Sequence, residues 1–337
     1  MHPTPASRQP HHASLTTLAA IAAILAVLFL CLSCGPAGFG LPDWKTVSGA
    51  ALMELRLSRL VTGFFVGAGL AASGTALQAV LRNPLAEPYV LGVSSGGALG
   101  AALVIVLGLA AFHSFVLPLG AFVAASLTLV WVWLLAHRVG GEYRPTVLIL
   151  TGVVVGSIVS SLLLLLLTFA PTRAVHGVTW WLLGNLQSTS WRLLGTAGFL
   201  IALSILSLFL EARTLNVLVL GKDRAYHAGV RLRVEVPLIL GAATLASAAA
   251  VALSGVIGFV GLIVPHAVRR LFGANHRTLI PWAACVGGVF LVVCDTLSRC
   301  VVPPYEIPVG VITSLCGGPF FLYLLCSKQH GGKASSS

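Results

Sequence analysis

The pentapeptide at residues 92–96, GVSSG, matches the G-x-S-x-G pattern of a nucleophile elbow, a strained turn that presents a serine hydroxyl for attack. This chemistry needs a strand before the serine, a helix after it, and a histidine and an acid within reach. Here the pentapeptide lies in apolar sequence typical of membrane helices, and His266, the nearest histidine candidate inside a span, has no predicted place beside it. An intramembrane serine hydrolase using Ser94 is therefore a remote alternative.

Other reactive side chains give little support to an enzyme or a metal site. Cys31 and Cys34 have the C-x-x-C spacing of a redox or zinc motif, but they end an apolar run and no second pair follows. His176 could ligate haem iron, although a single loop histidine is more often an ordinary surface residue. The sequence contains no H-E-x-x-H, Walker A or dinucleotide-binding motif. We expect no cofactor bound by this chain, so ATP and Mg²⁺ would be used by a partner ATPase.

The composition is that of an integral membrane protein. Of the 337 residues, 57% are hydrophobic and only 9% are charged, compared with about 25% charged in an average soluble domain. The longest polar insert, residues 211–235, reads as a loop and is too short to form an ATPase domain, which implies a separate energy-supplying partner. The net charge of +11 is dispersed along the chain and does not indicate nucleic-acid binding. Contact with membrane lipid is expected instead.

The apolar runs predict an all-α polytopic protein with ten transmembrane helices, since a span needs about 20 apolar residues. The helices are expected at residues 15–34, 60–81, 90–110, 115–136, 145–169, 193–210, 236–256, 257–272, 278–297 and 308–326. Glycines near residues 255–261 should turn the chain and make the eighth helix short. The expected organisation is a tail at residues 1–14, a transmembrane domain at 15–326 and a second tail at 327–337.

The distribution of charge predicts the orientation. With the N-terminus in the cytoplasm, most of the twenty Lys and Arg residues fall in inside loops, as the positive-inside rule requires. Both termini are then cytoplasmic. Helices two to five begin outside, whereas helices seven to ten begin inside, so a relation between these two groups of four would make an inverted repeat, which is common in transporters.

The segment Arg82–Leu103 places prolines and glycines between two membrane-length apolar runs. Irregular backbone survives at membrane depth only where protein or a water-filled cavity shelters it, because each unpaired backbone group costs several kcal/mol in hydrocarbon. The segment is therefore predicted to line a path through the protein. Uncharged polar groups nearby are expected to form interhelical hydrogen bonds or to line that path; they are Gln78, Asn83, Ser94, Ser95, Ser160 and Ser161.

Three arginines lie outside against the general charge bias. Arg56 and Arg59 are predicted to precede the second helix, and Arg299 to follow the ninth. Exposed guanidinium groups could make paired hydrogen bonds with carboxylates of a docking protein. Ordinary anchoring of helix ends at lipid head groups is the alternative.

The polar insert contains a predicted short helix, Lys222–Ala228, bracketed by Gly221 and Gly229. Gly229 is expected in the left-handed position that often ends a helix. Such a helix on the cytoplasmic face could act as a lever for a partner subunit. A solvated loop held near anionic lipid by its arginines is the alternative.

Several longer segments follow one another in order and at fitting spacing: RLSR at residues 56–59, GAGLAASGTALQ at 67–78, RNPLAEPYVLGVSSG at 82–96, GFVGLIVPHAVRR at 258–270, GANHR at 273–277 and EIPVGVITSLCGGPFFLYLL at 306–325. Together they resemble the FecCD family, the permease subunits of type II ABC importers for ferric siderophores, haem and cobalamin. The resemblance implies a homodimer of ten-helix subunits in the bacterial inner membrane, with two cytoplasmic ATPase subunits and a periplasmic binding protein. It implies import of an iron chelate (haem or a ferric siderophore), with cobalamin as the alternative, and no enzyme activity in this chain.

The resemblance also implies roles for single residues. Arg56, Arg59 and Arg299 resemble arginines that dock acidic residues of the binding protein. Asn83 and Leu85 resemble part of a cytoplasmic gate, and the turn that contains Glu142 and Tyr143, whose residues depart from the family pattern, would be its other element. One further segment resembles the coupling helix that rests in a cleft of the ATPase; it comprises Gly221, Lys222, Asp223, Arg224, Ala225, Tyr226, His227, Ala228 and Gly229. Asp223 stands where relatives often have Glu.

Overall fold

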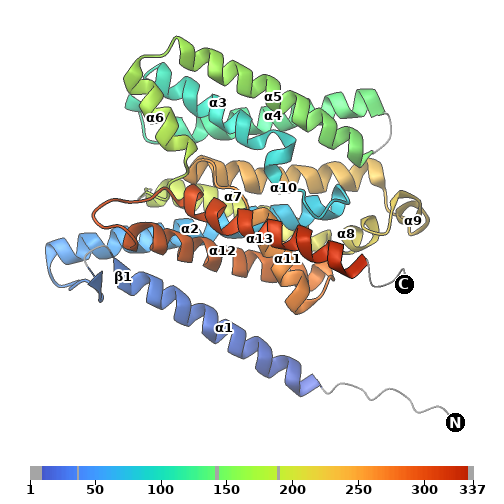
Figure 1. Ribbon diagram of the computed structural model, residues 1–337, viewed down its shortest axis with the longest axis horizontal. Helices are drawn as coiled ribbons and strands as arrows, with labels where there is room; N and C mark the ends of the chain where they lie inside the picture. Colours follow the sequence, from blue (N-terminus) through green and yellow to red (C-terminus); the bar gives the residue numbers. More distant parts are fainter. Residues whose placement is uncertain (1–9, 36–37, 141–143, 188–189, 333–337) are drawn as a thin grey trace.

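The computed structural model describes residues 10–35, 38–140, 144–187 and 190–332, and its elements are almost all helical (Figure 1). In chain order they are α1 (Pro10–Ser33), β1 (Cys34–Gly35), β2 (Gly38–Phe39), α2 (Val47–Val80), η1 (Pro88–Leu91), α3 (Val93–Val106), η2 (Leu109–Ala111), α4 (Val116–Gly140), α5 (Pro145–Thr168), α6 (Thr172–Leu182), α7 (Trp191–Leu210), α8 (Ala212–Leu218), α9 (Lys222–His227), α10 (Leu232–Ser254), α11 (Val260–Phe272), α12 (His276–Cys300) and α13 (Val309–Gly332). The helices α1 and α13 continue into both predicted tails.

Within the described residues, six helices are long and apolar enough to cross a membrane: α2, α4, α5, α7, α10 and α12. Shorter apolar helices lie at Leu18–Ser33, Val93–Val106 and Val309–Leu322, and α11 coincides with the predicted short eighth helix. Each predicted span thus corresponds to one helix of the structure. The all-helical polytopic fold is confirmed, and ten crossings are compatible with these helices.

The helices α2 and α10 form the centre of the bundle. About three quarters of the most apolar stretch of each is buried, against 28% for α4 and α5. They run antiparallel, since Gly69 lies near Ala246 and Ser73 bonds Ala243. In Figure 1, α3, α4, α5 and α6 form a layer on one side of α10, while α2, α11, α12 and α13 lie on the other. The opposite directions of α2 and α10, the first helices of the two groups of four, are what an inverted repeat requires.

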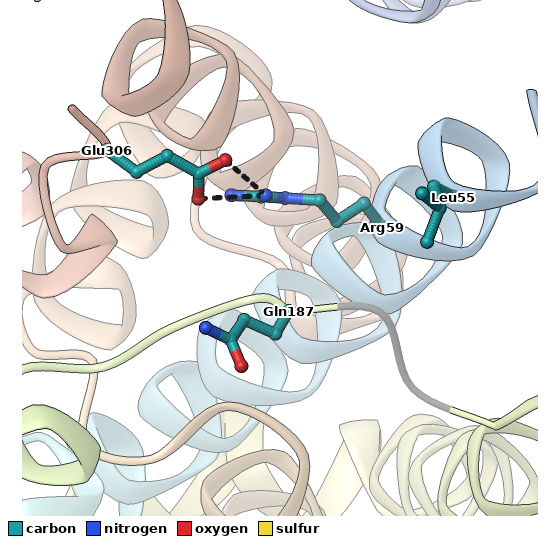
Figure 2. Close-up of a pocket in the computed structure, with 4 residues that line it drawn as sticks. All are labelled: Leu55, Arg59, Gln187 and Glu306. Atoms are coloured by element: carbon teal, nitrogen blue, oxygen red, sulfur yellow. Dashed lines mark hydrogen bonds and ion pairs between the residues drawn. The ribbon is translucent and has the colours of Figure 1, made fainter. Parts of the chain in front are cut away.

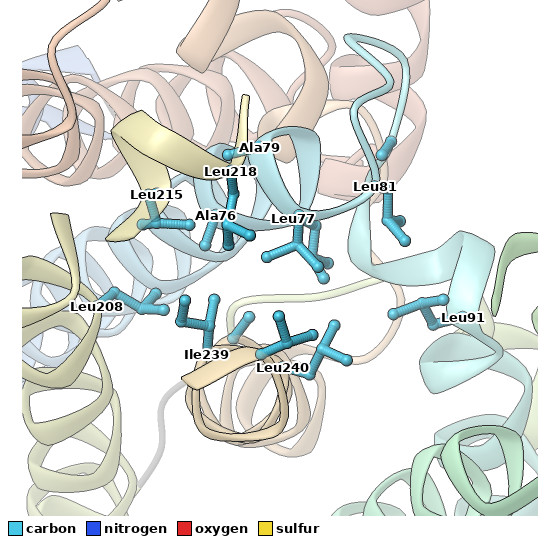
Figure 3. Close-up of a cluster of buried hydrophobic side chains, with 14 of the residues drawn as sticks. Ala76, Leu77, Ala79, Leu81, Leu91, Leu208, Leu215, Leu218, Ile239 and Leu240 are labelled. Carbon is cyan, nitrogen blue, oxygen red and sulfur yellow. The ribbon is translucent and has the colours of Figure 1, made fainter. Parts of the chain in front are cut away.

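The bundle has two ends, which we name by the elements they carry. The α9 end contains α8, α9, the start of α1 and the end of α13, and the β1–β2 end contains the short strand pair (Figure 1). A cluster of buried apolar side chains fills the α9 end, including Leu77, Leu215, Leu218 and Ile239 (Figure 3). A second cluster around Val66, Leu70, Ile201 and Leu291 includes Leu186 and Val309 toward the β1–β2 end. Each end of the bundle therefore lies over a packed apolar cluster.

Close backbone crossings join α2 to its neighbours, as the glycines of the sequence predict. A Cβ atom on Gly67 would overlap the backbone of Gly287 in α12, and one on Gly74 would overlap Gly261 in α11. Because lipid is as apolar as a protein core, such tight van der Waals packing is a main source of helix association in a membrane. The rigid α2–α12 pair therefore connects the two ends of the bundle.

Two irregular segments penetrate the bundle, one from each end. After α2, residues 81–92 turn back at Arg82, which has a φ of 50°, and Pro88 reaches the level of Gly261 beside α2. After α10, residues 255–259 turn inward and end at Phe259, with a φ of 69°. Both α3 and α11 therefore begin inside the bundle, which explains why they are short.

Hydrogen bonds between these two segments satisfy their irregular backbone. The Tyr89 hydroxyl donates to the Ile257 carbonyl at 2.6 Å and accepts from the Ile257 N–H at 2.8 Å. A carboxylate oxygen of Glu87 accepts from the N–H of Phe259 at 3.2 Å. The expectation that protein shelters the irregular backbone is confirmed; that the segment lines a path stays a prediction.

The predicted start of the second helix is wrong. The helix α2 begins at Val47, where the Thr46 hydroxyl accepts from the N–H of Gly49, and so Arg56 and Arg59 lie inside it. Arg299 likewise lies in the last turn of α12. The sequence reading treated these charges as helix ends, but each is paired within the protein and does not need to face water.

Two predicted loops contain helices. Residues 211–235 hold α8 and α9, and the predicted loop that contains His176 is α6. Both α6 and α8 are too short to resemble a span, so a search for membrane-length apolar runs passes over them.

Candidate functional site

The helix α9 projects at one end of the bundle, and one of its six residues is buried. Ala225 is fully buried against the apolar cluster of the α9 end. Asp223, Arg224, Tyr226 and His227 are exposed. A six-residue helix is too short to be stable alone, so α9 depends on its base and its caps.

The caps of α9 fix its orientation. Gly221 precedes it with a φ of 118° and Gly229 follows it with a φ of 82°, which confirms the predicted left-handed position. The N–H of Val230 donates to the Ala225 carbonyl and that of Gly229 to the Tyr226 carbonyl, both at 3.0 Å. This pair of bonds is a Schellman motif. The helix is therefore a rigid projection, with Ala228 as its C-terminal cap.

The helix α8 connects α9 to the starts of two long helices. The Thr214 hydroxyl donates to Glu235 in the first turns of α10 at 2.9 Å. Asn216 donates to the Asn275 side chain at 2.9 Å and accepts from the backbone N–H of His276 at 2.9 Å, both at the start of α12. A displacement of α9 would therefore reach α10 and α12 through polar contacts as well as packing.

The predicted gate residue Asn83 lies at the same end. Its side-chain oxygen accepts from the N–H of Leu85 at 3.0 Å, which fixes a tight turn directly after α2. Leu85 is exposed. Arg82 lies beside Gly221 at the start of α9, so this turn and α9 are neighbours. The other predicted gate residues, Glu142 and Tyr143, lie outside the described residues.

Gln78, predicted to bond between helices or to line a path, bridges two helices. Its amide N–H donates to the Gly261 carbonyl at 3.1 Å, and its oxygen accepts from Arg269 at 3.0 Å. Both partners belong to α11. Ser94 lies in the first turn of α3, and the Ser95 hydroxyl donates to the Gly92 carbonyl at 3.0 Å.

The GVSSG segment lacks the strand–turn–helix context of a nucleophile elbow. The 3₁₀ helix η1 precedes it, and α3 follows. His176 lies in α6, and its Nε2 accepts a hydrogen bond from Trp180 at 2.9 Å, so that nitrogen is engaged. Among the described residues no group of three or more His, Cys, Asp or Glu side chains could hold a metal ion.

At the β1–β2 end, the predicted exposure of the three arginines is wrong. Arg56 and Arg299 are buried, and the side chain of Arg59 is 12% exposed. Arg56 donates from Nη1 to the carbonyls of Leu32 and Gly40 at 3.1 and 2.8 Å, and thereby caps the last turn of α1. Guanidinium groups can be buried here because carbonyls and carboxylates of the same chain accept their N–H groups.

Arg59 and Arg299 share a buried carboxylate. Asp295 accepts from Arg59 Nη2 at 2.9 Å and lies 3.1 Å from Arg299 Nε, and its side chain is only 3% exposed. Arg59 also contacts Glu306, in the connection between α12 and α13, at 3.0 Å. Figure 2 shows Arg59 and Glu306 facing each other at a depression of about 320 Å³ that Leu55 and Gln187 also line.

Sequence reasoning missed the acidic partners of these arginines. Asp295 lies within an apolar run, and Glu306 opens the segment at residues 306–325, which was noted only for its resemblance to the family. The signal that was present is the rarity of charge in a spanning helix, where an ionisable residue almost always has a partner. For Asp295, Arg59 and Arg299 were among the basic residues predicted at that end.

Known proteins are similar to this chain over most of its length. The model of the FecCD transport family matches residues 18–327. The chain is 40% identical to the cobalamin import system permease protein BtuC of Halobacterium salinarum, over 87% of this chain and 77% of that one. It is 36% identical to the hemin transport system permease protein HmuU of Yersinia pestis, over 90% and 94%. A solved structure described as an inward-facing metal-chelate type ABC transporter aligns with a TM-score of 0.82 and 31% identity, over 92% and 98%.

Proposed function

Since the chain belongs to the FecCD transport family, we propose that two copies of it form the membrane pathway of an ABC importer for an iron chelate. It is a multi-pass permease subunit and not an enzyme, and it works with separate ATPase and substrate-binding partners. The observation that carries this function is the family match over almost the entire described chain. The serine-hydrolase alternative is abandoned.

At the α9 end, we assign α9 as the contact with the ATPase subunit, and that end as cytoplasmic. Its well-defined caps and its exposed polar face support this assignment, because a preorganised projection binds a partner at a lower entropic cost than a flexible loop does. Both termini would then be cytoplasmic, in an inner membrane. The contacts of α8 with α10 and α12 give the route by which ATP-driven closure of the partners would reach the pathway.

At the same end, the turn of Asn83 and Leu85 would form part of the inner gate. Its support is its position beside the start of α9 and the exposed side chain of Leu85. A gate that adjoins the ATPase contact can respond to it directly. Ser94, Ser95 and Gln78 would adjoin the pathway from α3 and α2.

At the β1–β2 end, Arg59 is the strongest candidate for docking the binding protein, with Arg299 and Arg56 beneath it. Its support is the depression that Arg59 lines together with the half-exposed Glu306. Charge pairing of this kind chiefly sets the rate and orientation of association. Arg56 is more buried and holds α1, so its contribution would be indirect.

Haem or a ferric siderophore is our first choice of cargo, in line with the hemin permease among the relatives. Cobalamin is the second candidate, because the cobalamin permease is 40% identical. Few charges near the proposed pathway suit a large chelated solute better than a bare ion. The chain itself would bind no resident cofactor.

The test is reconstitution with the ATPase and binding-protein partners in lipid vesicles. Uptake of haem, a ferric hydroxamate and cobalamin is measured separately with ATP, each with its loaded binding protein. ATP-dependent uptake of one iron chelate supports the proposal, and uptake of cobalamin alone replaces the cargo. A complex that assembles but transports none of the three would contradict the import function.

A further inference from the structure

Arg59 has two carboxylate partners that differ sharply in burial. Its Nε and Nη2 both donate to one oxygen of Asp295, at 3.2 and 2.9 Å. Its Nη1 contacts both oxygens of Glu306 at 3.0 Å. The Asp295 side chain is 3% exposed, whereas that of Glu306 is 45% exposed. Every nitrogen of the guanidinium group is therefore engaged by a carboxylate of the same chain.

The two carboxylates are not equally replaceable. Asp295 lies between Arg59 and Arg299. Its removal would leave both of these largely buried cations without their shared carboxylate. With Asp295 alone, the two arginines would carry a net charge of +1, and Glu306 brings the group to zero. Glu306 is thus the carboxylate that could leave, since water can solvate it.

We propose that Glu306 is a built-in competitor for Arg59, which a carboxylate of the binding protein displaces on docking. This inference rests on the proposed role of Arg59 in docking. Nη1 is the one guanidinium nitrogen that does not contact Asp295, and Glu306 already occupies it. An incoming carboxylate therefore exchanges with Glu306 and forms its ion pair at the cost of an existing one.

The position of Glu306 gives the exchange a consequence. It lies three residues before Val309, the first residue of α13. In the same connection, the N–H of Ile307 donates to the Ser298 carbonyl of α12 at 3.0 Å. Release of Glu306 from Arg59 removes the ion pair between this connection and α2, while the bond from Ile307 to α12 remains. Docking would thereby loosen the connection that leads into α13.

The experiment measures the equilibrium binding of the purified binding protein to the complete transporter in lipid nanodiscs. The variant is Glu306→Gln, which keeps the size of the side chain and removes its charge. We expect it to bind the partner about three- to tenfold more tightly than the natural chain, because the competing ion pair is gone. Glu306→Asp, which shortens the reach to Arg59 and keeps the charge, should also bind more tightly. It serves as the second variant if Glu306→Gln folds poorly.

Glu54→Gln is the matched control. Glu54 is an exposed carboxylate at the same end that accepts from Trp191 at 3.0 Å and is not an ion-pair partner of Arg59. This variant also loses one negative charge at the same end. It therefore measures how much the loss of long-range repulsion alone strengthens the binding of an acidic partner. The gain from Glu306→Gln must exceed the gain from Glu54→Gln. In an Arg59→Gln background, the gain from Glu306→Gln should disappear.

The outcomes separate the two levels of the proposal. If Arg59→Gln binds the partner as well as the natural chain does, the docking role of Arg59 is wrong whatever Glu306 does. If Arg59→Gln weakens binding but Glu306→Gln leaves it unchanged or weaker, docking stands and the competitor is refuted. Glu306 would then only hold the connection in place.

Discussion

At the α9 end, Asp223, Arg224 and Tyr226 project into solvent from a short capped helix, whereas at the β1–β2 end Arg56, Arg59 and Arg299 are held by groups of the same chain. One end presents a preformed surface, and the other presents a surface whose charges are already paired. Preformed surfaces bind without reorganisation. The comparison suggests constant attachment of a partner at the α9 end and conditional attachment at the β1–β2 end.

The largest expected effect comes from removing the shared carboxylate. Asp295→Ala should lower the free energy of unfolding by about 3–5 kcal/mol, because breaking a buried ion pair leaves charge uncompensated. At the α9 end, Asp223→Ala should change it by no more than about 0.5 kcal/mol, since this side chain is exposed. Thermal unfolding of the purified chain in detergent measures both. Similar losses for the two variants would remove the contrast between the ends.

The next effect concerns the attachment of α8. Asn216→Ala should lower the free energy of unfolding by about 1–3 kcal/mol, because it removes the side-chain oxygen that accepts from the backbone N–H of His276. It should also reduce transport per ATP hydrolysed, which vesicle uptake with a parallel phosphate assay measures. Ser157→Ala is the control, since this exposed hydroxyl bonds only within α5. Unchanged coupling in Asn216→Ala would show that packing alone carries the displacement.

A smaller effect isolates the cap of α9. Gly229→Ala should lower the free energy of unfolding by about 1 kcal/mol, because the φ of 82° at this position disfavours any residue with a Cβ. A steric clash is not the reason, since no atom lies within 4 Å of the added Cβ. Gly241→Ala in α10 also meets nothing within 4 Å but has helical backbone, and it should be neutral or stabilising. Binding of the ATPase subunit to each variant compares them. Equal binding would mean that the rigid cap of α9 is not needed.

The sequence predicted well what depends on local pattern. Membrane-length apolar runs predicted the order of the long helices, and the glycines around Lys222 predicted α9 because a left-handed glycine is a local requirement. It failed where the cause lies elsewhere in the chain. Arg59 and Asp295 are 236 residues apart in the sequence. Only the fold therefore reveals that Arg59 has a carboxylate partner and can lie inside a helix, away from water. The predicted exposure of Arg56, Arg59 and Arg299 was wrong for the same reason.

The smallest expected effect is in the salt dependence of docking. If docking exchanges Glu306 for a partner carboxylate at Arg59, the number of ion pairs barely changes, and added salt should weaken binding only slightly. In Glu306→Gln the same docking creates a new ion pair, so binding should fall about twofold more steeply between roughly 0.05 and 0.5 M NaCl, where screening becomes strong. Binding to nanodisc complexes across a salt series gives both slopes. A steep slope in the natural chain, equal to that of the variant, would show that Arg59 is already free when the partner arrives, and that both ends of the molecule are preformed.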